Sequence, residues 1–164
     1  MRTAILLWLM PVWAFPQSKE VVCINDAVAQ IDRNPSLSCD TVEASSIYGV
    51  DFDGGGEVLY CYRGKKLVKI REEIGLSWGR SSTEYYFHND TIMLFRVCEE
   101  LFPWTVDSSG LDHTRLFTSY EGAHYLRTWR NELQVIERGV RAWSGPPDEV
   151  EMNLSRLLLR RRRE

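Results

Sequence analysis

Residues 83–99 read TEYYFHNDTIMLFRVCE, two runs of aromatic and aliphatic residues joined by Asn89-Asp90. Apolar residues at adjacent positions give both faces of each run bulky side chains, and the Asn-Asp pair is typical of a two-residue hairpin turn. The cross-strand pairs expected from this turn are Phe87 with Ile92, Tyr85 with Leu94, and Tyr86 with Met93. The stretch predicts a central hairpin covered at least partly on each face, with Tyr85 and Phe87 as its main core residues.

Two further units of strand, turn and strand flank this hairpin. They are residues 57–62 and 66–72 around Arg63-Gly64-Lys65, and residues 113–119 and 124–129 around Tyr120-Glu121-Gly122-Ala123. Between the second and third units, Phe102-Pro103-Trp104 begins a loop whose aromatic side chains we expect to fold back on the sheet edge. Three such units predict an antiparallel β-meander of about six strands.

Helical periodicity is found at the two ends of the chain. In residues 19–33 the apolar positions recur at spacings of three and four, and Asn34-Pro35 then ends the helix. A loop rich in Ser, Asp and Thr is expected to follow it. Residues 133–143 have helical spacing interrupted by Gly139, and Pro146-Pro147-Asp148 is typical of the start of a C-terminal helix, which would carry Val150, Leu154 and Leu157 on one face. The predicted fold class is α+β, an antiparallel β-meander with an N-terminal and a C-terminal helix.

Composition limits the class of protein. The chain has 164 residues with a formal net charge of −3 and an apolar fraction of 44%, which fits one domain and argues against nucleic-acid binding.

Met1-Arg2 is followed by an apolar segment, residues 4–14, that has the layout of a secretory signal peptide. Cleavage is expected after Ala14, with a site near Ser18 as the alternative; a buried N-terminal helix or strand is the other interpretation. The mature chain then has no run long enough for a transmembrane helix, and residues 15–155 form a single β-rich domain of a periplasmic or extracellular protein.

The cysteine count agrees with export. Four cysteines, Cys23, Cys39, Cys61 and Cys98, follow the apolar segment, and an even number in a small exported chain predicts two disulfides. They allow three pairings, of which we favour Cys23 with Cys39 and Cys61 with Cys98. No C-x-x-C spacing indicates a redox or zinc site.

Three segments, 55–60 (GGEVLY), 67–70 (LVKI) and 84–89 (EYYFHN, preceded by Gly79), carry a family resemblance. They resemble a loose group of small exported bacterial proteins, mostly uncharacterised, in which an acidic, glycine-marked strand alternates with a Tyr-Tyr-Phe hairpin. The resemblance covers residues 54–129 and implies an exported β-meander. It supplies no catalytic residues, and the arginine-rich end of the chain lies outside it.

Catalytic motifs receive little support. Gly75-Leu76-Ser77-Trp78-Gly79 matches the G-x-S-x-G nucleophile elbow, and Asp112 and His124 follow in the order of a triad. However, the elbow requires a helix after the serine, and a strand is predicted there, so we interpret the two glycines as shaping a connection between strands. An alternative enzyme would bring together at least two of a wider set, Glu73, Glu84, His88, Asp112, His113 and His124.

Metal and cofactor sites are not indicated either. Asp51, Asp53 and Glu57 surround three glycines but lack EF-hand spacing, and the histidines have no zinc-site spacing.

Adjacent carboxylates occur at Glu72-Glu73 and Glu99-Glu100. Since neighbouring strand residues point to opposite faces, only one of each pair can line a cleft, and we expect exposed edge charges. No cofactor is expected.

The chain ends in a basic segment, residues 156–164, that holds five of its 20 basic residues. Arg160, Arg161, Arg162 and Arg163 follow three leucines, a pattern that would suit an anionic membrane surface, the acidic body of the same protein, or a solvated terminus. By subtraction, the sequence favours an exported, non-enzymatic protein that binds an unknown envelope protein, peptide or lipid. A small carboxylate/histidine hydrolase and a membrane-surface protein are the alternatives.

Overall fold

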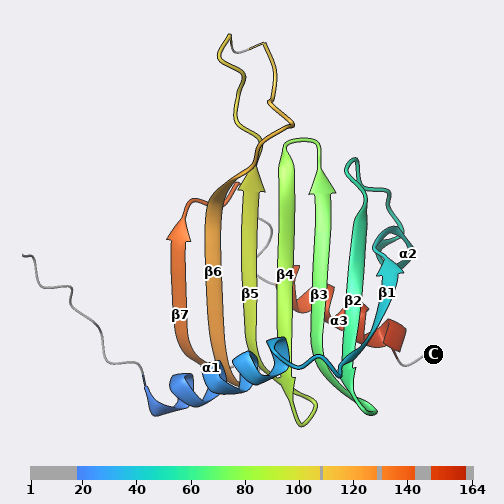
Figure 1. Ribbon diagram of the computed structural model, residues 1–164, viewed down its shortest axis with the longest axis vertical. Helices are drawn as coiled ribbons and strands as arrows, with labels where there is room; N and C mark the ends of the chain where they lie inside the picture. Colours follow the sequence, from blue (N-terminus) through green and yellow to red (C-terminus); the bar gives the residue numbers. More distant parts are fainter. Residues whose placement is uncertain (1–17, 108, 129–130, 143–148, 162–164) are drawn as a thin grey trace, which may run out of the picture.

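The computed structural model describes residues 18–107, 109–128, 131–142 and 149–161, in which seven antiparallel strands form one sheet in chain order, with helices on both faces (Figure 1). The elements are α1 (Lys19–Asp32), β1 (Ser38–Glu43), α2 (Ser45–Tyr48), β2 (Gly56–Arg63), β3 (Lys66–Leu76), β4 (Gly79–His88), β5 (Thr91–Leu101), β6 (Phe117–Thr128), β7 (Asn131–Gly139) and α3 (Glu149–Arg161). The α+β meander with a helix near each end is therefore confirmed. The predicted signal segment, residues 1–14, lies outside the described residues, as do residues 146–148, Arg162 and Arg163.

The central hairpin is β4–β5, as the quoted stretch predicts. Asn89 and Asp90 both have positive φ, 48° and 59°, and Phe87 pairs with Ile92. Beyond that pair the register shifts by one residue, so that Tyr85 faces Phe95 and Tyr86 faces Leu94. The two further pairs expected from the turn were therefore wrong, because a β-bulge adds a residue to β5 and brings Met93 and Leu94 into the same buried cluster.

One face of the sheet, which we call the α1 face, is partly covered by α1. Ser18 caps this helix by accepting a hydrogen bond from the Val21 N–H at 3.2 Å. Its buried residues Val21, Val28 and Ile31 pack against Val68, Tyr86, Met93, Leu94 and Tyr125 of the sheet. Figure 1 shows α1 crossing only the lower part of the sheet, so the upper part of the α1 face has no helix over it.

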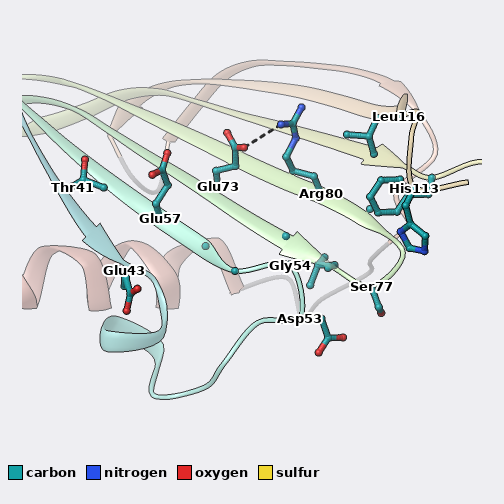
Figure 2. A pocket seen from close by; sticks show the side chains of 16 residues that line it. Thr41, Glu43, Asp53, Gly54, Glu57, Glu73, Ser77, Arg80, His113 and Leu116 are labelled. Atoms are coloured by element: carbon teal, nitrogen blue, oxygen red, sulfur yellow. Dashed lines mark hydrogen bonds and ion pairs between the residues drawn. The ribbon is translucent and has the colours of Figure 1, made fainter. Parts of the chain in front are cut away.

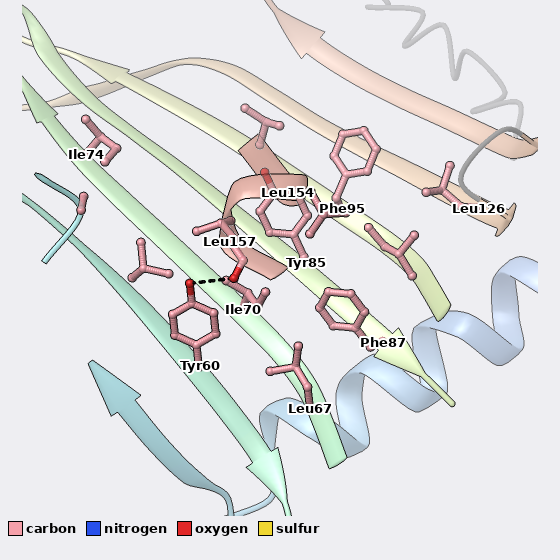
Figure 3. Close-up of a cluster of buried hydrophobic side chains, with 14 of the residues drawn as sticks. Tyr60, Leu67, Ile70, Ile74, Tyr85, Phe87, Phe95, Leu126, Leu154 and Leu157 are labelled. Carbon is pink, nitrogen blue, oxygen red and sulfur yellow. Dashed lines mark hydrogen bonds between the residues drawn. The ribbon is translucent and has the colours of Figure 1, made fainter. Parts of the chain in front are cut away.

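The opposite face, the α3 face, holds the larger cluster. Tyr85 and Phe87 are buried there, which confirms both as core residues. Leu154 and Leu157 of α3 pack onto this cluster, and the Tyr60 hydroxyl donates to the Leu157 carbonyl at 3.2 Å (Figure 3). The predicted C-terminal helix therefore closes the face of the sheet that α1 leaves open.

Two segments differ from the expected structure on the β1 side and at the end of β5. The loop expected after α1 contains β1 and α2; β1 is almost wholly exposed, so it has no apolar alternation for sequence reasoning to detect. The loop between β5 and β6 projects beyond the end of the sheet (Figure 1). Trp104 in this loop is 67% exposed, so the expectation that it folds back on the sheet edge was wrong.

The third predicted unit of strand, turn and strand, residues 113–129, also differs from the expected structure. Residues 120–123, expected as a turn, lie inside the continuous strand β6, which pairs with β7. Gly122 has a packing role there, because the Tyr120 ring lies against it and a Cβ on Gly122 would stand 2.5 Å from the Tyr120 hydroxyl. Of the residues with helical spacing, Leu133 and Ile136 lie in β7, an edge strand that buries little. Val140 follows this strand, and Trp143 lies outside the described residues.

The disulfide pairing expected from the sequence was wrong. Cys39 and Cys61 face each other across β1 and β2 and are bonded, with 4.2 Å between their Cα atoms. Cys23 is exposed on α1 and Cys98 lies on β5, and neither is in a disulfide. The register of the first strand pair decides the partner of Cys39, and that register depends on an exposed strand that local sequence patterns do not detect.

We predict that the Cys39–Cys61 bond stabilises the fold by about 3 kcal/mol, because it closes a loop of 22 residues and ties the exposed edge strand β1 to β2. Chemical denaturation of C39S/C61S under oxidising conditions should show this loss, while C98S, the matched control in an interior strand, should lose about 1 kcal/mol or less. Equal stability of the double variant and the wild type would show that the bond does not constrain the unfolded chain.

Candidate functional site

The polar floor of a cavity lies on the α3 face, above the ends of β3, β4 and β5. Glu72 stands between Ile70 and Ile74 of the core cluster, so alternation places its side chain on the same face. The strand register sets Glu72 beside Thr83, and Ser81 beside Glu99. Two carboxylates and two hydroxyls therefore form one polar group in an otherwise apolar surface.

Both carboxylates are buried. The exposed fraction is 5% for Glu72 and 2% for Glu99. The expectation of exposed edge charges was wrong because β3 and β5 are interior strands. The neighbouring Glu73 and Glu100 contact Arg80 instead, at 3.1 Å and 2.9 Å.

Glu99 is tied to the segment after β7. Its carboxylate accepts a hydrogen bond from the Ala142 N–H at 2.7 Å and lies 3.3 Å from the Arg141 Nε. The Arg141 guanidinium also lies over the Tyr120 ring, 4.9 Å from its centroid. These contacts offset part of the cost of burying the Glu99 charge and hold the chain against the sheet.

Glu72 lies close to Tyr48, the last residue of α2. The Tyr48 hydroxyl is buried. This burial, and next the charge of the neighbouring Glu72, raises the pKa of Tyr48 above its ordinary value. The Arg156 guanidinium of α3 lies over the Tyr48 ring, 5.9 Å from its centroid. Tyr48 therefore lies close to a cation of the helix and lines the same cavity as the floor carboxylates.

The cavity between this floor, α2 and α3 has a volume of about 480 Å³, within the range of small-molecule sites. Its walls are mostly aromatic and aliphatic. The lining residues besides the four of the floor are Tyr48, Val50, Phe52, Ile74, Leu76, Trp78, Tyr85, Val97, Arg141, Asn153 and Arg156. We call this space the α3-face cavity. An apolar wall with a few convergent polar groups is the usual composition of a ligand site.

A second, more polar hollow of about 720 Å³ lies at the end of the sheet near the loop before β2 (Figure 2). Among the residues considered for calcium, Asp53 and Glu57 line it and Asp51 does not. The described residues contain no group of three or more metal-ligating side chains. This hollow therefore offers acidic groups without the geometry of a cation site.

The G-x-S-x-G segment forms the tight turn between β3 and β4. Gly75 packs directly on the backbone of Gly54, and a Cβ on Gly79 would collide with the Glu100 carbonyl. Ser77 lies exposed in the turn. The interpretation of two glycines shaping a connection between strands is confirmed, because backbone contact explains both.

The residues expected for a hydrolase do not form an acid–base pair. Glu73 and His113 line the same hollow, but Glu73 binds Arg71 and Arg80, and His113 packs on Phe102 with 4.5 Å between ring centroids. His124 stacks on Phe95 and lies 3.1 Å from Glu132. Within the described ranges no hydrogen bond joins two of the six residues in that set, which also includes Glu84, His88 and Asp112.

Tyrosine ionisation provides a test of this packing. Burial first, and then a neighbouring carboxylate, raises the pKa of Tyr48, Tyr86 and Tyr120, for Tyr120 to about 12. The unfolded chain ionises at about pH 10, so the folded state binds more protons above that pH. We predict that stability is unaffected by these groups below about pH 10 and falls as the pH rises toward 12.

A pH titration would test this prediction, with ultraviolet absorbance reporting the ionisation of the tyrosines and circular dichroism reporting the loss of the fold. In the native protein, part of the tyrosine signal should ionise only as the fold is lost, whereas in denaturant all seven tyrosines should titrate together. Full ionisation near pH 10 with an intact fold would contradict the burial of these side chains.

Comparison with known proteins adds no assignment. No protein-family model, curated protein or solved structure matches the chain. Among the described helices, none has both the length and the apolar character needed to cross a membrane.

Proposed function

We propose that this chain is an exported, non-enzymatic binding protein whose ligand lies in the α3-face cavity. The observation that carries the proposal is the pair of carboxylates, Glu72 and Glu99, buried beside Ser81 and Thr83 on an apolar floor. Burying a carboxylate costs several kcal/mol before its contacts are counted, and apolar residues at these positions would serve a purely structural sheet face better. A binding role accounts for polar groups concentrated at the cavity.

Export is supported by residues 1–14, which have the layout of a signal peptide, and is compatible with the Cys39–Cys61 disulfide. The candidate partners remain an envelope protein, a peptide or a lipid, and a space of about 480 Å³ favours a small molecule or a short segment of a larger one. The non-enzymatic assignment is supported by the contacts of Glu99, whose oxygens are engaged by Arg141 and Ala142.

An enzyme using Glu73 and His113 is the second candidate, because both line the hollow of Figure 2. Arg80 lies 3.1 Å from the Glu73 carboxylate in an ion pair, which suits a structural role better than that of a general acid. The third candidate, membrane attachment through Arg160–Arg163, rests on the sequence alone, because Arg162 and Arg163 and the side chains of Arg160 and Arg161 lie outside what the structure describes.

We predict that the mature chain, starting at residue 15, binds the fluorescent probe 8-anilinonaphthalene-1-sulfonate saturably in this cavity. The Asn153→Trp variant should weaken binding at least tenfold, because residue 153 of α3 lines the cavity and a larger side chain would fill it. The Met152→Trp variant is the matched control, since the adjacent Met152 is exposed and does not line the cavity.

Fluorescence titration of the wild type and the two variants, together with their melting temperatures, tests this prediction. Loss of probe binding in Asn153→Trp alone, with an unchanged melting temperature, supports the site. Absence of saturable binding to the wild type, or equal binding by the two variants, contradicts it.

A further inference from the structure

Resting on the proposed function, we propose that the ligand of the α3-face cavity is a short zwitterionic peptide of two or three residues with apolar side chains. Its ammonium group would lie at Glu72 and its carboxylate at Arg156. The geometry behind this is that Glu72 and Arg156, which carry opposite charges, line the same cavity together with Tyr48.

The negative end of the site is on the floor. Glu72 comes from the interior strand β3 and is buried, so a cationic group that reaches it is largely removed from water, where a charge-assisted hydrogen bond is stronger than at the surface. A carboxylate has several acceptor positions and can add a donor from a ligand to the contacts it already makes. The Thr83 hydroxyl, beside Glu72 in the register, is a further acceptor for an ammonium group.

The positive end of the site is on the helix. Arg156 contacts the Tyr48 ring and makes no ion pair with a carboxylate of the described residues. Asn153 lies one helical turn before it and also lines the cavity, so the same side of α3 presents a guanidinium and an amide. A guanidinium binds a carboxylate through two parallel hydrogen bonds, which makes it well suited to a peptide C-terminus.

The volume of the cavity limits the length of the ligand. Glu72 and Arg156 both line a space of about 480 Å³, which is in the range of small-molecule sites. An extended peptide gains about 3.3–3.6 Å per residue, so a peptide of two or three residues suits a space of this size and a much longer one does not. The hydroxyls of Ser81 and Thr83 make no hydrogen bond to another described residue and are available to the peptide amide groups.

Other ligand chemistries use less of the site. A fatty acid would satisfy Arg156 but would bring its hydrocarbon chain against the buried carboxylates, at the cost of leaving polar groups unsatisfied. A simple amine would satisfy Glu72 and leave Arg156 unused. Phe52, Leu76 and Trp78 on the cavity wall would contact the apolar side chains of a peptide.

Isothermal titration calorimetry with the mature protein tests the proposal through three probes. The dipeptide Leu-Phe should bind, while N-acetyl-Leu-Phe, which lacks the ammonium group, and Leu-Phe-amide, which lacks the carboxylate, should each bind at least tenfold more weakly. Arg156→Gln should bind Leu-Phe and its amide equally, and Glu72→Gln should bind Leu-Phe and its acetyl derivative equally.

The controls separate the possible failures. Arg115→Gln removes an arginine of the β5–β6 loop and should behave as wild type. Equal binding of all three probes to the wild type overturns the charge assignment. No binding of Leu-Phe while 8-anilinonaphthalene-1-sulfonate still binds overturns the ligand class and leaves the proposed function intact; binding of neither overturns both. If Glu72→Gln lowers the melting temperature, the test rests on Arg156→Gln alone, because Arg156 is exposed. Unequal binding of Leu-Phe and Leu-Phe-amide by that variant then overturns the charge assignment.

Discussion

The sheet has apolar side chains on both faces, and no second sheet covers them in the part of the chain that the structure describes. The rest of the structure follows from this constraint. Tyr86 and Leu94 point to one face, and Tyr85 and Phe95 point to the other. Each face therefore requires a helix, and the chain supplies one from each end of the meander. α1 buries three aliphatic residues on its face, while α3 buries Leu154 and Leu157 on the other. The α3-face cavity is the part of this second face that α2 and α3 enclose without filling.

Local periodicity predicted the helix with one apolar face and the strands that carry apolar residues along their whole length. The first helix, the central hairpin and the hairpin around Gly64 could be read this way because their apolar residues recur at the period of their own structure. β1 could not be read, since its edge position leaves almost every residue exposed. β6 was interrupted in the prediction at Gly122, where the glycine makes room for the Tyr120 ring instead of turning the chain. The true partner of Cys39 followed from the β1–β2 register, and a local pattern does not contain that information.

In the candidate site too, local sequence patterns indicate some features, while others depend on contacts between distant segments. The position of Glu72 between Ile70 and Ile74 is a sequence signal that places its side chain on an apolar face, and it supports burial once β3 is known to be interior. The contacts of Glu99 with Arg141, and of Tyr48 with Arg156, join segments far apart in the chain. Their approach depends on the order of the strands and on the face that α3 covers. The pattern around Glu72 therefore contains a signal for burial that the expectation of exposed edge charges overlooked, whereas no local pattern indicates the arginines that line the cavity.

The two buried carboxylates have different roles because their surroundings differ. Glu99 binds the Ala142 N–H and Arg141, so much of the cost of burying its charge is offset within the fold. In doing so it holds the residues directly after β7 against the sheet. Glu72 faces Tyr48 and borders open space that a ligand can enter. The position of α3 on this face depends on Leu154 and Leu157, which pack on the core. One carboxylate thus helps to hold the walls of the cavity in place, while the other faces its interior.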